Sequence, residues 1–105
     1  MTLSSNTTRM SSAEPLSPAK NRPIADLKNI GPVTARSLYA IGIAREADLR
    51  QAGAVEAYLR VKALDPKGTT LVLLYALQGA LTDTYWNDLP APLKTALRDE
   101  LQRRR

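Results

Sequence analysis

The sequence predicts an all-α fold, a compact bundle of five to six short helices that contains a helix-hairpin-helix and has a buried central helix at about residues 70–81. Apolar residues recur at steps of three and four through most of residues 24–101, which is the period of an amphipathic helix. Glycine and proline separate these periodic segments. With 105 residues, the chain is long enough for one domain with a single modest core.

The first 22 residues are predicted to be a disordered basic tail, followed by a helical domain over residues 23–105. The tail is rich in serine and threonine, and its few apolar residues show no period. It is either a basic arm that touches phosphate or a solvated terminus. The basic charge lies at the two ends, because three arginines close the chain and the 80 residues between carry nine groups of each sign. The pI near 9.9 therefore does not indicate a basic domain.

The segment from Leu27 to Ile43 predicts the helix-hairpin-helix. The first helix is expected over about Ala25–Asn29 and the second over about Pro32–Ile41. Proline suits the first position of a helix, since its missing N–H would have had no partner there. Asn29 and Gly31 tolerate the left-handed conformation that ends a helix. The turn between the two helices should therefore be very tight.

Two further helices are expected before the central one. A short helix that includes Ala47 should end at Gly53, and another should run from about Val55 to Leu64. Each carries a glutamate four residues before an arginine, which predicts a surface ion pair. These pairs are Glu46 with Arg50 and Glu56 with Arg60.

The segment from Leu71 to Leu81 is apolar nearly all round, which is typical of a buried central helix. A buried strand is the alternative, but the length and the many Leu and Ala residues favour a helix with a cap at Thr69 or Thr70. Gly79 is expected to allow a close approach of another backbone.

The last helix is expected over about Ala91–Gln102. Its inward face is predicted to consist of Leu93, Ala96, Leu97 and Leu101. Before it, Trp86 should cover the core with its ring and find an acceptor for its indole N–H.

The hairpin turn is the first candidate binding site. N–H groups near Gly31, Val33 and Thr34 could bind a DNA backbone phosphate, because a helix start presents unpaired N–H groups. The Thr34 hydroxyl, Lys28 and Arg36 would assist. Such contacts position a protein without reading sequence. The alternative is that the turn is only a compact helix joint, since Pro32 supplies no N–H.

The basic face of the last helix is the second candidate, formed by Lys94, Arg98 and Arg105. It either meets an anionic partner or is a solvated face. The tyrosines are spread over several predicted helices, so packing at the core or its rim is favoured over base stacking.

The composition excludes several function classes. The chain has no histidine and no cysteine, so it lacks the commonest general base and any thiolate metal site. We expect no cofactor, no metal, no small-molecule substrate and no enzymatic activity. No run is apolar enough to span a membrane, and no signal peptide is evident, so a cytoplasmic location is expected.

Five segments in this order resemble the C-terminal domain of the TfoX/Sxy family, bacterial regulators of natural competence. They are Leu27–Pro32, Gly42–Ile43, Gly53–Leu59, Leu73–Leu77 and Trp86–Pro90. The resemblance covers residues 24 to about 101. It implies an all-helical fold with a helix-hairpin-helix and a role in DNA binding or transcription regulation of DNA-uptake genes.

Two hypotheses for function result. The first is a non-enzymatic DNA-associated regulatory module with weak, non-specific phosphate contact. The second is a protein–protein interaction adaptor without direct DNA binding. Because the resemblance implies that competence regulators usually carry another domain before this one, a separately encoded TfoX N-terminal-like domain is a candidate partner.

Overall fold

The computed structural model describes residues 21–104, and within them it confirms the all-α prediction. Five α-helices follow one another: α1 (Pro32–Ala40), α2 (Glu46–Ala52), α3 (Ala54–Leu64), α4 (Leu71–Leu81) and α5 (Ala91–Arg104). Two one-turn 3-10 helices, η3 (Ile24–Asp26) and η4 (Trp86–Asp88), precede α1 and α5. Over these residues the only β-type pairing is an isolated bridge between Pro23 and Arg45.

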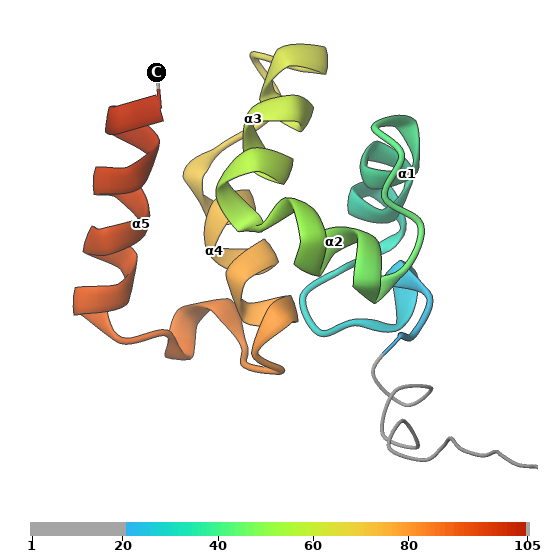
Figure 1. Cartoon of the computed structure of the whole chain (residues 1–105), viewed down its shortest axis with the longest axis horizontal. Helices are drawn as coiled ribbons and strands as arrows, with labels where there is room; N and C mark the ends of the chain where they lie inside the picture. Colours follow the sequence, from blue (N-terminus) through green and yellow to red (C-terminus); the bar gives the residue numbers. More distant parts are fainter. Residues whose placement is uncertain (1–20, 105) are drawn as a thin grey trace, which may run out of the picture.

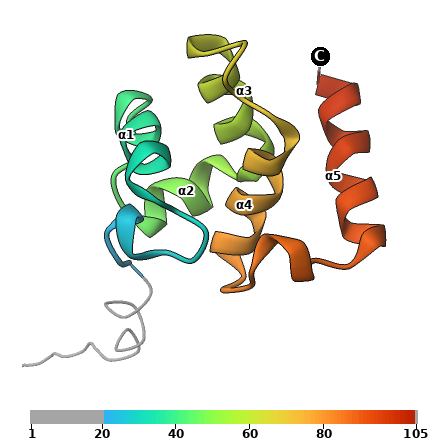
Figure 2. The same cartoon turned by 180° about the vertical axis from the view of Figure 1, so that it is seen from behind.

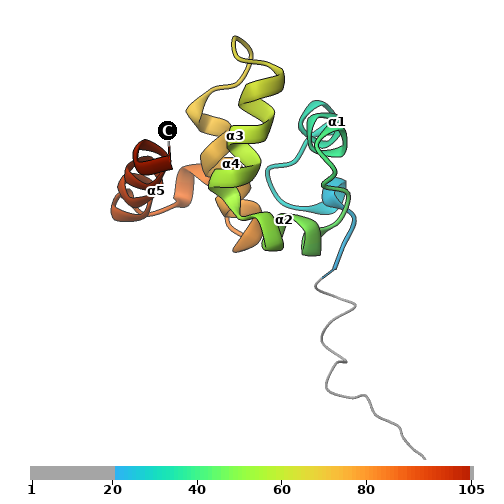
Figure 3. The ribbon, with the colours of Figure 1, turned by 45° about the horizontal axis from the view of Figure 1, so that its top comes forward.

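Helices α3 and α4 form the centre of the molecule (Figure 1). Helix α1 lies on one side of this pair and α5 on the other, and the views in Figures 2 and 3 agree on this arrangement. Helix α2 contacts both α3 and α4. The largest fully buried side chains come from four helices and from the segment between α1 and α2: Ile24, Leu38, Ile43, Leu49, Leu74 and Leu77.

The predicted central helix is confirmed as α4. Six of its residues are buried, although Leu71 and Val72 in its first turn are 39% and 43% exposed. Thr70 is the N-cap residue, but its side chain makes no capping hydrogen bond. The prediction for Gly79 also holds, because a Cβ at this position would collide with the backbone carbonyl oxygen of Thr84.

The prediction of a first helix over Ala25–Asn29 was wrong. Only η3 forms, and Leu27 is already extended with φ −80° and ψ 152°. The start lacks a side-chain cap, and the left-handed Asn29 (φ 73°) prevents the helix from continuing. Leu27 and Ile30 are nevertheless buried, as their spacing predicted. The unit before α1 is thus a turn that follows a 3-10 helix rather than a hairpin of two α-helices.

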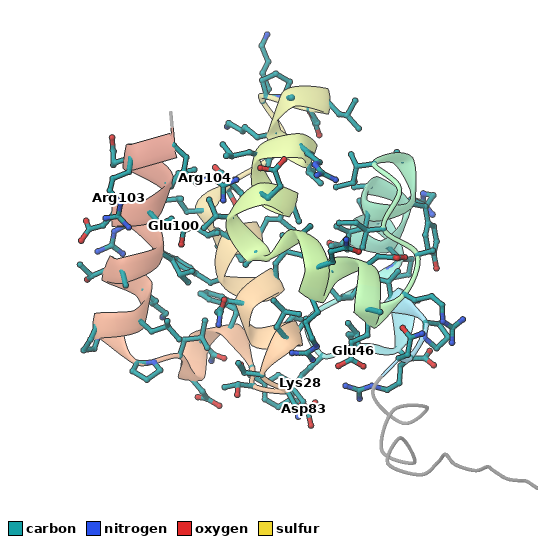
Figure 4. The ribbon with its side chains drawn as sticks, in the orientation of Figure 1. Lys28, Glu46, Asp83, Glu100, Arg103 and Arg104 are labelled. Atoms are coloured by element: carbon teal, nitrogen blue, oxygen red, sulfur yellow. The ribbon has the colours of Figure 1, made fainter. Side chains whose placement is uncertain are left out.

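Glu46 was predicted to form a surface ion pair with Arg50, but its side chain is only 4% exposed. Arg22, at the start of the domain, covers the Glu46 side chain. The backbone N–H of Glu46 donates to the carbonyl oxygen of Arg22 at 2.8 Å, and the Arg22 Nε lies 3.2 Å from a Glu46 carboxylate oxygen. Arg50 binds the other oxygen at 2.9 Å. We call Arg22, Glu46 and Arg50 the Glu46 corner; Glu46 is labelled in Figure 4.

Asn21 and Arg22 belong with the helical domain rather than with the predicted tail. The Asn21 side chain accepts a hydrogen bond from the Ala47 N–H at 3.0 Å, and its carbonyl oxygen accepts one from Arg45 Nη2 at 2.7 Å. The remainder of the predicted disordered tail, residues 1–20, lies outside the described residues.

The carboxyl-terminal predictions need two corrections. Ala96 is exposed rather than inward-facing, although Leu97 and Leu101 are buried as predicted. Trp86 does not cover the core: it is 36% exposed, and among the described residues its indole N–H finds no acceptor. The reason is that η4 packs on the outside of α4 with none of its residues fully buried, so Trp86 lies at the rim of a groove rather than over the core.

Candidate functional site

The turn before α1 is held in place by the side chain of Asn29. Its Nδ2 donates to the carbonyl oxygens of Thr84 at 2.9 Å and Ala76 at 3.3 Å, and its Oδ1 accepts from the Trp86 N–H at 3.2 Å. A Cβ on Gly79 would lie 2.5 Å from this Nδ2, so glycine is needed there for the amide to reach its acceptors. We call Asn29, Gly79, Thr84 and Trp86 the Asn29 junction. It ties the turn to the end of α4 and the start of η4.

The start of α1 has the features expected of an anion site. Gly31 is the N-cap and offers no side chain, and Pro32 occupies the first helical position. The N–H groups of Val33 and Thr34 have no acceptor among the described residues. Val33 is 68% exposed. The helix dipole adds positive potential at this end. The N–H groups of the first turn of α1 can therefore donate hydrogen bonds to a phosphate oxygen.

The predicted cations do not both converge on this helix start. Lys28 turns toward the segment after α4, where its Nζ lies 4.0 Å from an Asp83 carboxylate oxygen (Figure 4) and 4.5 Å from the ring centre of Tyr85. Arg36 is exposed on α1 and makes no ion pair with any described residue. Lys28 is therefore anchored beside the Asn29 junction, whereas Arg36 on α1 has no ionic partner within residues 21–104.

A groove of about 300 Å³ opens beside the start of α1. Val33 and Thr34 line one side of it, and Val72 and Thr70 from the start of α4 line another. Trp86 completes this part of the lining. Two helix starts without side-chain caps thus border one groove with an exposed indole.

The second predicted basic site lies next to the same indole. Lys94 Nζ is 5.5 Å from the ring centre of Trp86 and 5.4 Å from that of Tyr75. Arg98 Nη1 donates to the Tyr75 hydroxyl at 2.9 Å. Arg105 lies outside the described residues. The structure therefore brings the predicted site at the start of α1 close to the predicted basic face of α5, because Trp86 borders both the groove and Lys94.

The expectation that the tyrosines pack in the core or at its rim was right for two of them. Tyr58 and Tyr75 are 5% and 9% exposed, whereas Tyr39 and Tyr85 are 48% and 57% exposed. Sequence reasoning missed that Tyr85 and Trp86, adjacent in the chain, form an exposed aromatic pair flanked by lysines. The adjacency was the available signal, and Lys94 follows soon after the pair, but Lys28 lies far before it in the sequence.

The carboxyl groups of Glu46 and Asp48, which lie outside this site, stabilise the fold. Burial works against ionisation of Glu46, but hydrogen bonds from Arg22 and Arg50 outweigh it and lower the pKa of this carboxyl. Backbone N–H groups of Ala44 and Arg45 each donate to Asp48 at 3.0 Å and lower its pKa as well. Within residues 21–104, no three acidic, histidine or cysteine side chains gather in a way that could hold a metal ion.

None of the helices that the structure describes has the length and apolar character needed to cross a membrane.

The comparisons with known proteins agree with the fold. The chain is similar to an uncharacterized protein from Listeria monocytogenes in a triclinic crystal form, with 32% identity, a TM-score of 0.70, and coverage of 76% of this chain and 90% of that one. A protein of unknown function from the same organism, in a tetragonal crystal form, gives 32% identity and a TM-score of 0.70 over 78% of this chain and 99% of that one. No curated protein matches the chain.

The family comparison assigns the domain. The model of the TfoX C-terminal domain matches residues 20–101, which include α1 to α4, η4 and most of α5. The segments that carried the resemblance in sequence all lie within this match. The chain therefore belongs to the TfoX C-terminal domain family.

Proposed function

We propose that this chain is a non-enzymatic, DNA-associated regulatory module that contacts the phosphate backbone through the start of α1. The single observation that carries the proposal is that the N–H groups of Val33 and Thr34, at an exposed helix start without a side-chain cap, find no acceptor in the part of the chain that the structure describes. A helix start of this kind favours an anion. Arg36 on α1 adds positive charge, Lys28 does so when it exchanges Asp83 for a phosphate, and a role in competence regulation accords with the family.

The contact is weak and does not read sequence, because few phosphates are neutralised. Non-specific affinity should lie in the range of about 10⁻⁴ to 10⁻⁶ M and fall with added salt. The test is a titration of duplex DNA at two salt concentrations with the parent chain and with the double variant Lys28→Glu, Arg36→Glu. The double variant should bind much more weakly at low salt.

A matched control separates the site from bulk charge. Lys67 and Arg103 are both exposed, and both lie outside α1 and the turn before it. The double variant Lys67→Glu, Arg103→Glu makes the same change in net charge and should retain more affinity than the turn variant. Equal losses in the two variants, or no binding of the parent chain at low salt, contradict contact through this turn.

A second function has its own supporting observation. Val33, Val72 and Trp86 are large exposed apolar side chains, and all three line the same groove. Exposed apolar patches of this kind mark protein interaction sites. In this alternative the chain is an adaptor whose partner is a separately encoded TfoX N-terminal-like domain. Co-purification of the two from nuclease-treated lysate, lost in Val33→Ser with Val72→Ser, would support it, and failure to co-purify would count against it.

A further inference from the structure

Two neighbouring aromatic side chains stand exposed at η4 with a lysine beside each. Tyr85 is 57% and Trp86 36% exposed, although large aromatic residues normally bury their area. The Lys28 ammonium lies 4.5 Å from the Tyr85 ring centre, and the Lys94 ammonium lies 5.5 Å from that of Trp86. We call Lys28, Tyr85, Trp86 and Lys94 the aromatic–lysine surface.

The backbone that carries these rings is fixed by the protein itself. The Trp86 N–H donates to Asn29 Oδ1 at 3.2 Å, and the Thr84 carbonyl oxygen accepts from Asn29 Nδ2 at 2.9 Å. The Thr84 N–H donates to the Gly79 carbonyl oxygen at 2.8 Å. A ligand that stacks on the rings therefore meets a pre-organised backbone and does not have to order it.

The aromatic–lysine surface meets the groove beside the start of α1 at Trp86. Trp86 lines the same groove as Val33 and Thr34, whose N–H groups have no acceptor within residues 21–104. A nucleic-acid strand alternates phosphates with bases, so a phosphate at the helix start would bring the neighbouring base to the indole. In a duplex the bases are stacked on one another inside the helix and their faces are covered. Only an unpaired strand can use both features together.

Local charge indicates that stacking, rather than phosphate attraction, must supply much of the affinity. Lys28 and Lys94 lie beside the two rings, Arg98 binds Tyr75 next to Lys94, and two carboxylates, Asp83 and Asp88, flank the rings in the sequence. Asp83 already pairs with Lys28 at 4.0 Å. A surface with one net positive charge releases few counterions, so its affinity depends only weakly on salt.

We propose that the aromatic–lysine surface binds single-stranded DNA, with unpaired bases stacked on Tyr85 and Trp86 and the adjoining phosphates held by Lys28, Lys94 and the start of α1. The proposal rests on the proposed DNA-binding function and names the form of DNA that the site takes. Stacking on aromatic rings tolerates any base, since every base has a π face. Binding is accordingly independent of base sequence.

The chain contains one tryptophan, Trp86, so its intrinsic fluorescence reports directly on this site. Titration with a short oligothymidylate should quench Trp86 fluorescence. A blunt-ended duplex with the same number of phosphates should quench much less and bind about tenfold or more weakly. The affinity for the oligothymidylate should change with salt less steeply than the affinity for the duplex.

Variants assign the effect to the rings, with binding followed by anisotropy of a labelled oligothymidylate. Trp86→Leu should weaken binding about tenfold or more, within the effect of losing one stacking partner. Tyr85→Leu should act in the same direction, and its exposure means that this change does not open the core. Tyr39→Leu, at an exposed tyrosine of α1 outside the surface, is the control and should bind normally.

The outcomes separate this inference from the proposed function. If the oligothymidylate and the duplex bind equally, or if Tyr85→Leu and Trp86→Leu both bind like the parent chain, the single-strand site is refuted and phosphate contact by the turn remains. If the parent chain binds neither form at low salt, both proposals fail. A thermal melt of each variant, monitored by far-UV circular dichroism, confirms that a lost affinity belongs to a folded protein.

Discussion

The Asn29 junction and the Glu46 corner perform the same structural task with different chemistry. Each ties the segment before α1 to a later part of the chain through one polar side chain. Asn29 uses a neutral amide that pairs with backbone atoms of residues 76, 84 and 86. Glu46 uses a buried carboxylate that pairs with Arg22 and Arg50.

The difference between the two regions lies in what they leave available to a ligand. At the Glu46 corner one carboxylate binds both arginines, so their guanidinium groups are engaged within the protein although the corner keeps one net positive charge. At the Asn29 junction the amide satisfies the backbone, so the lysines and aromatic rings beside it remain exposed. A neutral side chain such as Asn29 can therefore hold two segments together beneath a binding surface. A buried carboxylate such as Glu46 instead engages the neighbouring cations and serves only to stabilise the fold.

Gly79→Ala should have the largest effect, because it breaks the Asn29 junction. The new methyl group would meet the Thr84 carbonyl oxygen and Asn29 Nδ2, and neither can move without losing a hydrogen bond. We expect the free energy of unfolding to fall by about 3 kcal/mol, at the upper end of what overpacking costs. Urea denaturation measures it. A loss no larger than that of Ala80→Gly in the same helix turn would contradict a tight junction.

Glu46→Gln breaks the other tie and should cost about 2 kcal/mol near neutral pH, because two charge-assisted hydrogen bonds weaken at a buried site. The loss in free energy of unfolding caused by Glu46→Gln should depend on pH. The pKa of Glu46 is lowered in the folded chain, so its contribution is complete above the unfolded pKa of about 4.3 and is lost as pH falls through the folded pKa. The stabilities of parent and variant should converge in acid.

The control for this pH dependence is Gly79→Ala. Its destabilisation should be the same at neutral and acid pH, because the Asn29 junction contains no titratable side chain. Urea denaturation of both variants across the acid range compares the two ties directly. A Glu46→Gln difference that persists unchanged in acid would show that the carboxylate charge does not stabilise the corner.

The contrast also shows which features of this molecule are local enough to predict. Helices α1 and α4 could be located from sequence, because proline at a helix start, glycine after a helix and apolar periodicity act over a few residues. The Glu46 to Arg50 pair was found for the same reason. Its burial was missed because Arg22, 24 residues earlier, supplies the cover.

The candidate site was less predictable because it is assembled over long distances in the chain. The hydrogen bonds of Asn29 span 47, 55 and 57 residues, and no periodicity reports them. Asn29 was recognised only as a residue that tolerates a left-handed turn. The exposure of Tyr85 and Trp86 likewise depends on where η4 lies after α4, which local patterns do not determine.

Lys28→Gln tests whether the Asn29 junction and the Glu46 corner differ in DNA binding. Its effect should be smaller than the losses of stability in Gly79→Ala and Glu46→Gln. Lys28 lies beside the Asn29 junction, and losing one phosphate contact should lower DNA affinity about threefold and reduce the salt slope by about one. Arg45→Gln makes the same charge change beside the Glu46 corner, where the guanidinium is bound to the Asn21 carbonyl oxygen. Arg45→Gln should therefore bind DNA like the parent chain in a salt-dependent titration. Equal effects would mean that total charge, not position, governs binding.

Glu56→Gln should have the smallest effect, and it tests the Glu46 corner against the same sequence pattern. Glu56 also precedes an arginine by four residues and binds Arg60 at 2.8 Å, which lowers its pKa, and Arg104 of α5 contacts its other oxygen. Its side chain is 31% exposed, against 4% for Glu46, so water replaces the lost partners. The melting temperature should stay within experimental error of the parent value, at low and at moderate salt. A loss comparable to that of Glu46→Gln would mean that the pairing itself, rather than burial beneath Arg22, gives the Glu46 corner its strength.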